Sequence, residues 1–178
     1  MKELYLPINF KKRLTNLTAA PKEVNGALIY LPLDGVDVVV ASRILGGGTS
    51  DALTSADPRM LSLANKFFEQ NHTYGFVEFH THTEETVRRH GIHYAFNLSD
   101  GDIETITRNY AGSKTYRHFL VTPNVLKLHK MEGNNVVPIS YMTPKTVDKD
   151  QGLEKRIKNK FDKLHAEMGI PIFDLRMN

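Results

Sequence analysis

Apolar positions follow a two-residue period in several short runs along the chain. Runs rich in Val, Ile, Leu and Phe with this period predict strands, because such residues suit a half-buried pleated surface. The strands expected on this basis are 23–31, 36–44, 76–79, 119–121, 125–128 and 136–139. Residues 1–6 are expected to form a short strand or an extended lead.

Other segments carry apolar residues at helical spacing. They predict helices at 10–17, 58–68, 103–110 and about 149–169. Asn9 is an acceptable N-cap for the first of these helices, and Asp57 with Pro58 is a typical start for the second.

Two glycine-containing stretches lie between these elements. Asp34-Gly35 predicts a hairpin turn. The cluster 46–48 is expected to be a flexible connection rather than a phosphate loop, because no Gly-Lys-Ser/Thr follows it.

The order of these elements favours one α/β domain over residues 1–178. The chain lacks the regular βαβ alternation of a doubly wound sheet, so we expect a mixed, mostly antiparallel sheet flanked by helices. An apolar content of 40% is enough for a sizeable core.

Composition excludes several classes of protein. The chain has no cysteine, which rules out a disulfide framework, a thiolate-bound zinc and a cysteine nucleophile. The net charge of +3 is mild and basic residues are interleaved with acidic ones, so nucleic-acid binding is not expected. We expect no membrane span and no signal peptide, and hence a cytoplasmic protein.

Candidate chemistry gathers in residues 74–102. His80 and His82 lie two residues apart on a predicted strand, so they share a face at about 6–7 Å and could converge on one ion. Without another signal, ordinary hydrogen-bonded histidines are the alternative interpretation. Glu78 shares the same face and is a further candidate ligand or base.

A serine and two carboxylates follow at a predicted helix start, in Ser99-Asp100-Gly101-Asp102. An open zinc site needs three protein ligands, and nitrogen and oxygen donors serve when thiolates are absent. His80, His82 and one of these aspartates would supply such a set.

The motifs together resemble the JAMM metalloprotease family, also called the MPN or Mov34 domain. The resemblance covers about residues 9–140, and three motifs in the same order carry it: Glu23-Val24-Asn25-Gly26, His80-Thr81-His82 and Ser99-Asp100-Gly101-Asp102. It implies a JAMM/MPN-like fold of the cytidine-deaminase-like type.

The same resemblance implies a role for each site residue. His80, His82 and Asp102 would bind one zinc ion per chain, Glu23 would deprotonate the zinc-bound water, and Ser99 would donate a hydrogen bond to the oxyanion. The family pattern favours Asp102 over Asp100 as the third ligand and ranks Glu78 below Glu23.

One segment departs from the family pattern. Residues 83–98 are longer than the usual gap and are expected to form an extended loop, and Thr83 replaces a common proline. The segment is either a substrate-contacting loop or a tolerated insertion. His90 and His93 within it are expected to be loop residues rather than further ligands.

The function implied is that of a zinc isopeptidase or peptidase that removes ubiquitin or a ubiquitin-like modifier from lysine. A strand edge that binds the extended Gly-Gly tail of the modifier would suit this substrate. The alternatives are a non-catalytic MPN scaffold module and a zinc amidase acting on small peptides. The modifier and the oligomeric state stay open.

Overall fold

The computed structural model describes residues 4–33, 36–48 and 75–142, together with Gly152, Lys155, Arg156 and Asn159. The strands are β1 (Leu4–Tyr5), β2 (Val24–Leu33), β3 (Val36–Gly47), β4 (Gly75–Thr81), β5 (Arg117–Val121), β6 (Leu126–Glu132) and β7 (Asn135–Met142). The helices bounded in these ranges are α1 (Ile8–Leu17), α3 (Glu84–His90), α4 (Ile92–Ala95) and α5 (Asp100–Tyr110).

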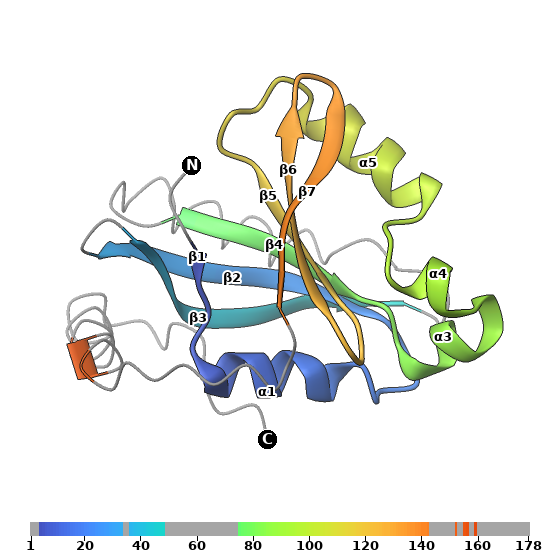
Figure 1. Ribbon diagram of the computed structural model, residues 1–178, viewed down its shortest axis with the longest axis horizontal. Coiled ribbons are helices and arrows are strands. Elements are labelled where there is room, and N and C mark those ends of the chain that lie inside the picture. Colours follow the sequence, from blue (N-terminus) through green and yellow to red (C-terminus); the bar gives the residue numbers. More distant parts are fainter. Residues whose placement is uncertain are drawn as a thin grey trace.

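The strands form a single seven-stranded sheet in the order β1-β3-β2-β4-β5-β6-β7. β1 pairs with β3 and β4 pairs with β5 in parallel, whereas the other neighbours are antiparallel. Figure 1 shows a curled sheet in which β5, β6 and β7 cross the direction of β2 and β3. The prediction of a mixed, mostly antiparallel α/β sheet is therefore confirmed.

Alternation along the central strands separates an apolar face from a polar one. Val77 and Phe79 on β4 pack in the main core, together with Phe10 and Leu14 from α1. Because successive strand residues point to opposite faces, Glu78 and His80 lie on the side away from α1. A smaller cluster of Ile106, Tyr116 and Met131 covers part of that second face.

An ion pair is buried within the sheet on the face opposite the histidines. Arg117 donates to Asp37 at 2.6 Å, and its guanidinium lies 4.5 Å from the ring centre of Tyr30. The side chains of Arg117 and Asp37 are 5% and 9% exposed, so water cannot replace either partner.

Replacing Asp37 by alanine is expected to cost about 3–5 kcal/mol of unfolding free energy, because the Arg117 charge would stay buried without its partner. Denaturant unfolding of the two proteins measures the difference. The double variant Asp37→Leu with Arg117→Met is the control, and it should recover much of the loss. Equal stability of Asp37→Ala and the parent would contradict this account.

Two local predictions are wrong. α1 begins one residue before Asn9, and its N-cap is Pro7, whose fixed φ suits the start of a helix. Gly46 and Gly47 form the end of β3 rather than a flexible connection, because both residues pair with β2.

Other predictions fall outside the described residues. They are the helix at 58–68, the turn at Asp34-Gly35 and most of the C-terminal helix at about 149–169. In that last range, the four described residues are helical and exposed. Within the part of the chain that the structure describes, no helix combines the length and the apolar composition needed to cross a membrane.

Candidate metal centre

The carboxyl end of β4 delivers the two histidines to one point. His80 lies within β4, and the backbone of His82 continues the pairing by donating to Val121 O at 2.8 Å. The two side chains turn toward each other, with Nε2 of His80 3.3 Å from Nε2 of His82. Both residues are buried, at 2% and 3% exposure, so the shared face expected from their spacing is confirmed.

The third member of the cluster comes from the start of α5. Asp102 Oδ2 lies 3.5 Å from Nε2 of His80 and 3.8 Å from Nε2 of His82. Ser99 is the N-cap of α5 and forms a capping box with Asp102, so the local sequence fixes the position of this carboxylate. The three residues form a group that could bind a metal ion. Asp100 is exposed and is not part of the group.

The hydrogen bonds of His82 support a cation at this point. Its Nδ1 lies 2.9 Å from the carbonyl oxygen of Ala95, which can only accept, so Nδ1 carries the hydrogen. In the neutral ring, Nε2 then presents a bare lone pair to His80 and Asp102. Nitrogen and oxygen lone pairs this close repel one another unless a positive charge lies among them. The set of lone pairs therefore fits a metal ion.

The directions in which the surroundings shift the pKa values of His82 and Asp102 agree with this. Burial lowers the pKa of His82, but Asp102 and the Ala95 carbonyl outweigh it, so the net pKa is raised. Burial raises the pKa of Asp102, yet the neighbouring His80 and His82 hold it well below its usual range. Both shifts mean that the site favours a carboxylate beside positive charge.

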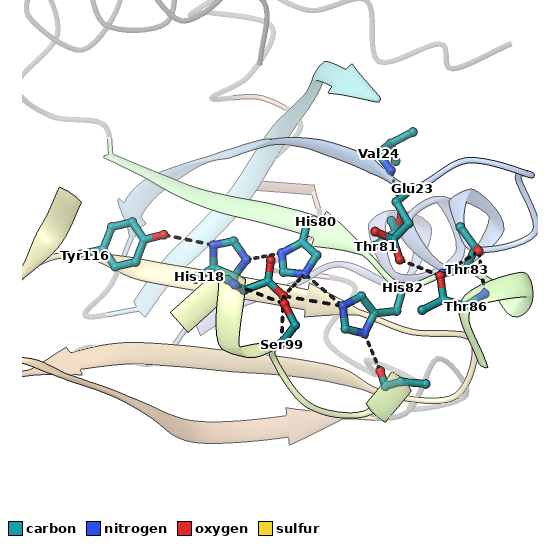
Figure 2. Close-up of polar contacts among 12 residues, drawn as sticks. Glu23, Val24, His80, Thr81, His82, Thr83, Thr86, Ser99, Tyr116 and His118 are labelled. Carbon is teal, nitrogen blue, oxygen red and sulfur yellow. Dashed lines mark hydrogen bonds and ion pairs between the residues drawn. The ribbon is translucent and has the colours of Figure 1, made fainter. Parts of the chain in front are cut away.

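Glu23 is buried immediately before β2. Its carboxylate accepts a hydrogen bond from Thr86 Oγ1 at 2.6 Å (Figure 2). Burial raises its pKa, and Thr86 and the nearby His82 offset only part of that rise. Its backbone is also fixed, because Gly48 N donates to Glu23 O at 2.7 Å. A buried carboxyl with a raised pKa beside a possible metal site suits a proton acceptor.

Residues 83–98 are not the extended loop expected, because most of them form α3 and α4. Thr83 caps α3 in a capping box, in which its side chain accepts from Thr86 N and the Thr86 side chain accepts from Thr83 N. Gly91 connects the two helices with φ at 82°, a conformation that favours glycine.

This segment supports the site from two sides. Thr86 of α3 holds Glu23, and Ala95 of α4 holds His82. Tyr94 also stacks on the His82 ring, with centres 5.8 Å apart and planes 13° apart. The two alternatives considered for this segment were a substrate loop and a tolerated insertion. The structure adds a third role, because the segment supports the His82 ring and the Glu23 carboxylate. His90 and His93 are exposed and lie outside the group of three.

Ser99 directs its hydroxyl to Asp102. Ser99 Oγ donates to Asp102 Oδ2 at 2.7 Å and accepts from Asp102 N at 3.1 Å. In this arrangement Ser99 orients the carboxylate, and its predicted role as an oxyanion donor stays a prediction.

Glu78 has other partners than the metal group. Its two carboxylate oxygens accept hydrogen bonds from Tyr110 at 2.6 Å and Tyr116 at 2.8 Å. Burial and the Glu78 charge raise the pKa of both tyrosines above the usual value, so both hydroxyls keep their hydrogens. Glu78 is therefore placed as a supporting acceptor and not as a member of the group.

Sequence reasoning missed Thr86, Tyr116 and His118. His118 is buried next to His80, and burial holds its pKa well below the usual value, so its ring is neutral. The two-residue spacing of Tyr116 and His118 was a signal for a shared strand face. Nothing in the sequence showed that β5 lies beside β4.

The strand that carries His80 offers no free edge to a substrate tail along its paired residues. β4 is paired on both sides, by β2 at His80 and by β5 at His80 and Thr81. The described edges of the sheet are β1 and β7. A substrate backbone therefore cannot extend the sheet at β4, because its hydrogen-bonding groups are already used.

Comparisons with known proteins give a likeness of fold alone. No protein-family model matches the sequence, and no curated protein matches it either. The solution structure of protein DSY2949 from Desulfitobacterium hafniense is similar, with a TM-score of 0.51 and 16% sequence identity. The similarity covers 77% of this chain and 90% of that chain, and at this identity it is a likeness of fold and carries no evidence for a shared activity.

Proposed function

We propose that the chain is a zinc-dependent isopeptidase or peptidase of the JAMM/MPN type, acting on lysine-linked ubiquitin or a ubiquitin-like modifier. The observation that carries the proposal is the convergence of His80, His82 and Asp102 next to the buried Glu23. Nitrogen and oxygen donors in this number suit an open zinc site. Bound zinc would supply an activated water and polarise the scissile carbonyl.

We assign proton transfer to Glu23 and stabilisation of the oxyanion to Ser99. Thr86 occupies Oε1 of Glu23, so we assign Oε2 to take the proton of the attacking water and return it to the leaving amine. Ser99 is the hydroxyl we assign to the oxyanion. Its single hydrogen goes to Asp102 Oδ2 in this structure, so the role requires the hydroxyl to turn from Asp102 to the oxyanion.

The substrate tail is assigned to the side of the site formed by α4. Ile92 and Tyr94 are 56% and 37% exposed, and Tyr94 stacks on His82. Tyr94 offers apolar contact beside the cluster, and Ile92 lies in the same helix. A small residue pair such as Gly-Gly could approach there without a side-chain clash.

The first test is metal content together with turnover. We expect about one zinc per chain by elemental analysis, since the described part of the chain holds one such set of ligands. Purified protein is then assayed against ubiquitin-like modifiers joined through Gly-Gly by peptide or isopeptide bonds, and against short peptides. A chelator should abolish the cleavage and added zinc should restore it.

The outcomes separate the candidate functions. Cleavage of short peptides alone would replace the modifier by a small amide as the substrate. Zinc binding without cleavage of any of these substrates would favour the scaffold role. Protein that binds no zinc even when the metal is added would overturn the proposal.

A smaller change tests how Glu23 is held. Thr86→Val removes the hydroxyl that stabilises the charged carboxylate, so the already raised pKa of Glu23 should rise further. A base works when deprotonated, and the acid limb of the kcat/KM profile should therefore move to higher pH with zinc retained. Thr86→Ser is the matched control and should keep the limb near its original pH. An unmoved limb in Thr86→Val would count against Glu23 as the base.

A further inference from the structure

A line of hydrogen bonds leads from the metal cluster into the protein interior. Nδ1 of His80 lies 2.7 Å from Nε2 of His118, and Nδ1 of His118 lies 3.1 Å from the hydroxyl of Tyr116. Tyr116 donates to Glu78, which also accepts from Tyr110. Figure 2 shows His118 and Tyr116 on the side of His80 away from His82.

The sheet brings these residues together. β4 and β5 pair in parallel with Glu78 opposite His118, so alternation puts Glu78, His80, Tyr116 and His118 on one face. Tyr110 comes from α5, and its ring stacks on Tyr116 with centres 3.8 Å apart. His118 and Tyr116 are 6% and 7% exposed, so this network is formed largely away from water.

The direction of each hydrogen bond follows from the contact between Tyr116 and Glu78. A tyrosine has one hydroxyl hydrogen, and Tyr116 gives it to Glu78, so its oxygen can only accept from His118. The His118 ring is buried, at 6% exposure, and its two nitrogens face His80 and Tyr116 rather than a carboxylate, so the ring carries a single hydrogen. Nδ1 therefore holds that hydrogen and Nε2 does not. That bare Nε2 must accept from Nδ1 of His80, which leaves Nε2 of His80 free of hydrogen.

We propose that His118 is a positioning residue that fixes the tautomer and the ring orientation of His80, so that Nε2 faces the metal cluster with its lone pair exposed. Tyr116 and Glu78 set the orientation of His118. The inference rests on the proposed function for its metal-binding consequence alone, since the tautomer exists in metal-free protein. Partners of this kind raise the basicity of a histidine ligand and fix its geometry.

Tyr116→Phe and Tyr110→Phe form a matched pair of variants. Each removes one hydroxyl that donates to Glu78, from stacked neighbouring rings, but only Tyr116 contacts His118. The first readout is two-bond ¹H–¹⁵N NMR of the histidine rings in metal-free protein. We expect His80 to carry its hydrogen on Nδ1 in the parent and in Tyr110→Phe, and to become a mixture of tautomers in Tyr116→Phe.

The second readout is zinc affinity by competition with a chromophoric chelator. Tyr116→Phe should weaken binding by about 10-fold or more, within the range of about 10–100-fold typical of such partners, and Tyr110→Phe should change it little. His118→Leu should fall in the same range. His118→Gln should recover part of the affinity, because the amide oxygen can accept from His80.

Two results would overturn the inference. One is a parent protein in which His80 carries its hydrogen on Nε2. The other is an equal change in tautomer and zinc affinity for Tyr116→Phe and Tyr110→Phe. Failure of the proposed function has a different signature, namely a parent that binds no zinc or cleaves no substrate while the tautomer pattern holds.

Discussion

Glu23→Gln is expected to slow turnover about 10²–10⁴-fold while the protein keeps its zinc. Glutamine preserves the size of the side chain and an oxygen that can accept from Thr86, but it cannot take up a proton. The loss should appear in kcat, because the proton is transferred in the chemical step. Steady-state kinetics and elemental analysis of the same preparations measure both quantities.

Two other acids serve as comparisons. Glu84→Gln removes the same charge from an exposed position in the first turn of α3, and it should leave the rate nearly unchanged. Glu78→Gln should act through the tyrosine network, with weaker zinc binding and near-parental turnover once zinc is saturating. If Glu78→Gln abolishes turnover at saturating zinc and Glu23→Gln does not, the base has been assigned wrongly.

Asp102→Asn is expected to remove zinc and activity together. The change keeps an oxygen that can cap the first turn of α5, but it removes the negative charge that lies next to both histidines. Changing a residue that only hydrogen-bonds to a metal ligand weakens metal binding by about 10–100-fold. The loss of zinc affinity in Asp102→Asn should be larger, because a ligand itself is changed. His80→Ala and His82→Ala should behave in the same way.

Asp100→Asn is the matched control, since it makes the same substitution in the same helical turn at an exposed residue. It should keep both zinc and turnover. Zinc content and circular dichroism distinguish metal loss from unfolding. A folded Asp102→Asn protein that binds zinc as tightly as the parent would exclude Asp102 as the third ligand.

Much of the fold was accessible from local patterns. The two-residue period located β4 and placed His80 and Glu78 on one face, and helical spacing located α1 and α5. These signals work because burial on one face imposes a period on each element separately. The helices of residues 83–98 were missed because they are short and mostly exposed, so they carry little apolar periodicity.

Within the site, contacts between residues close in sequence were predictable and contacts between distant segments were not. Ser99 and Asp102 interact three residues apart, and the capping pattern of their segment is visible in the sequence. His80 and His82 are two residues apart on one strand. By contrast, Thr86 lies 63 positions from Glu23, and His118 lies 38 positions from His80.

The two motifs that contribute to the candidate metal group could be located in the sequence, because the local geometry of each follows from one strand or one helix start. The residues that hold His80 and His82 in place could not be read from these motifs, because they come from other elements. Strand order and register bring His118 beside His80, and the packing of α3 and α4 brings Thr86 to Glu23 and Ala95 to His82. Periodicity specifies which face of a helix or strand is buried. Which other element packs beside it depends on how all the elements bury their apolar faces together.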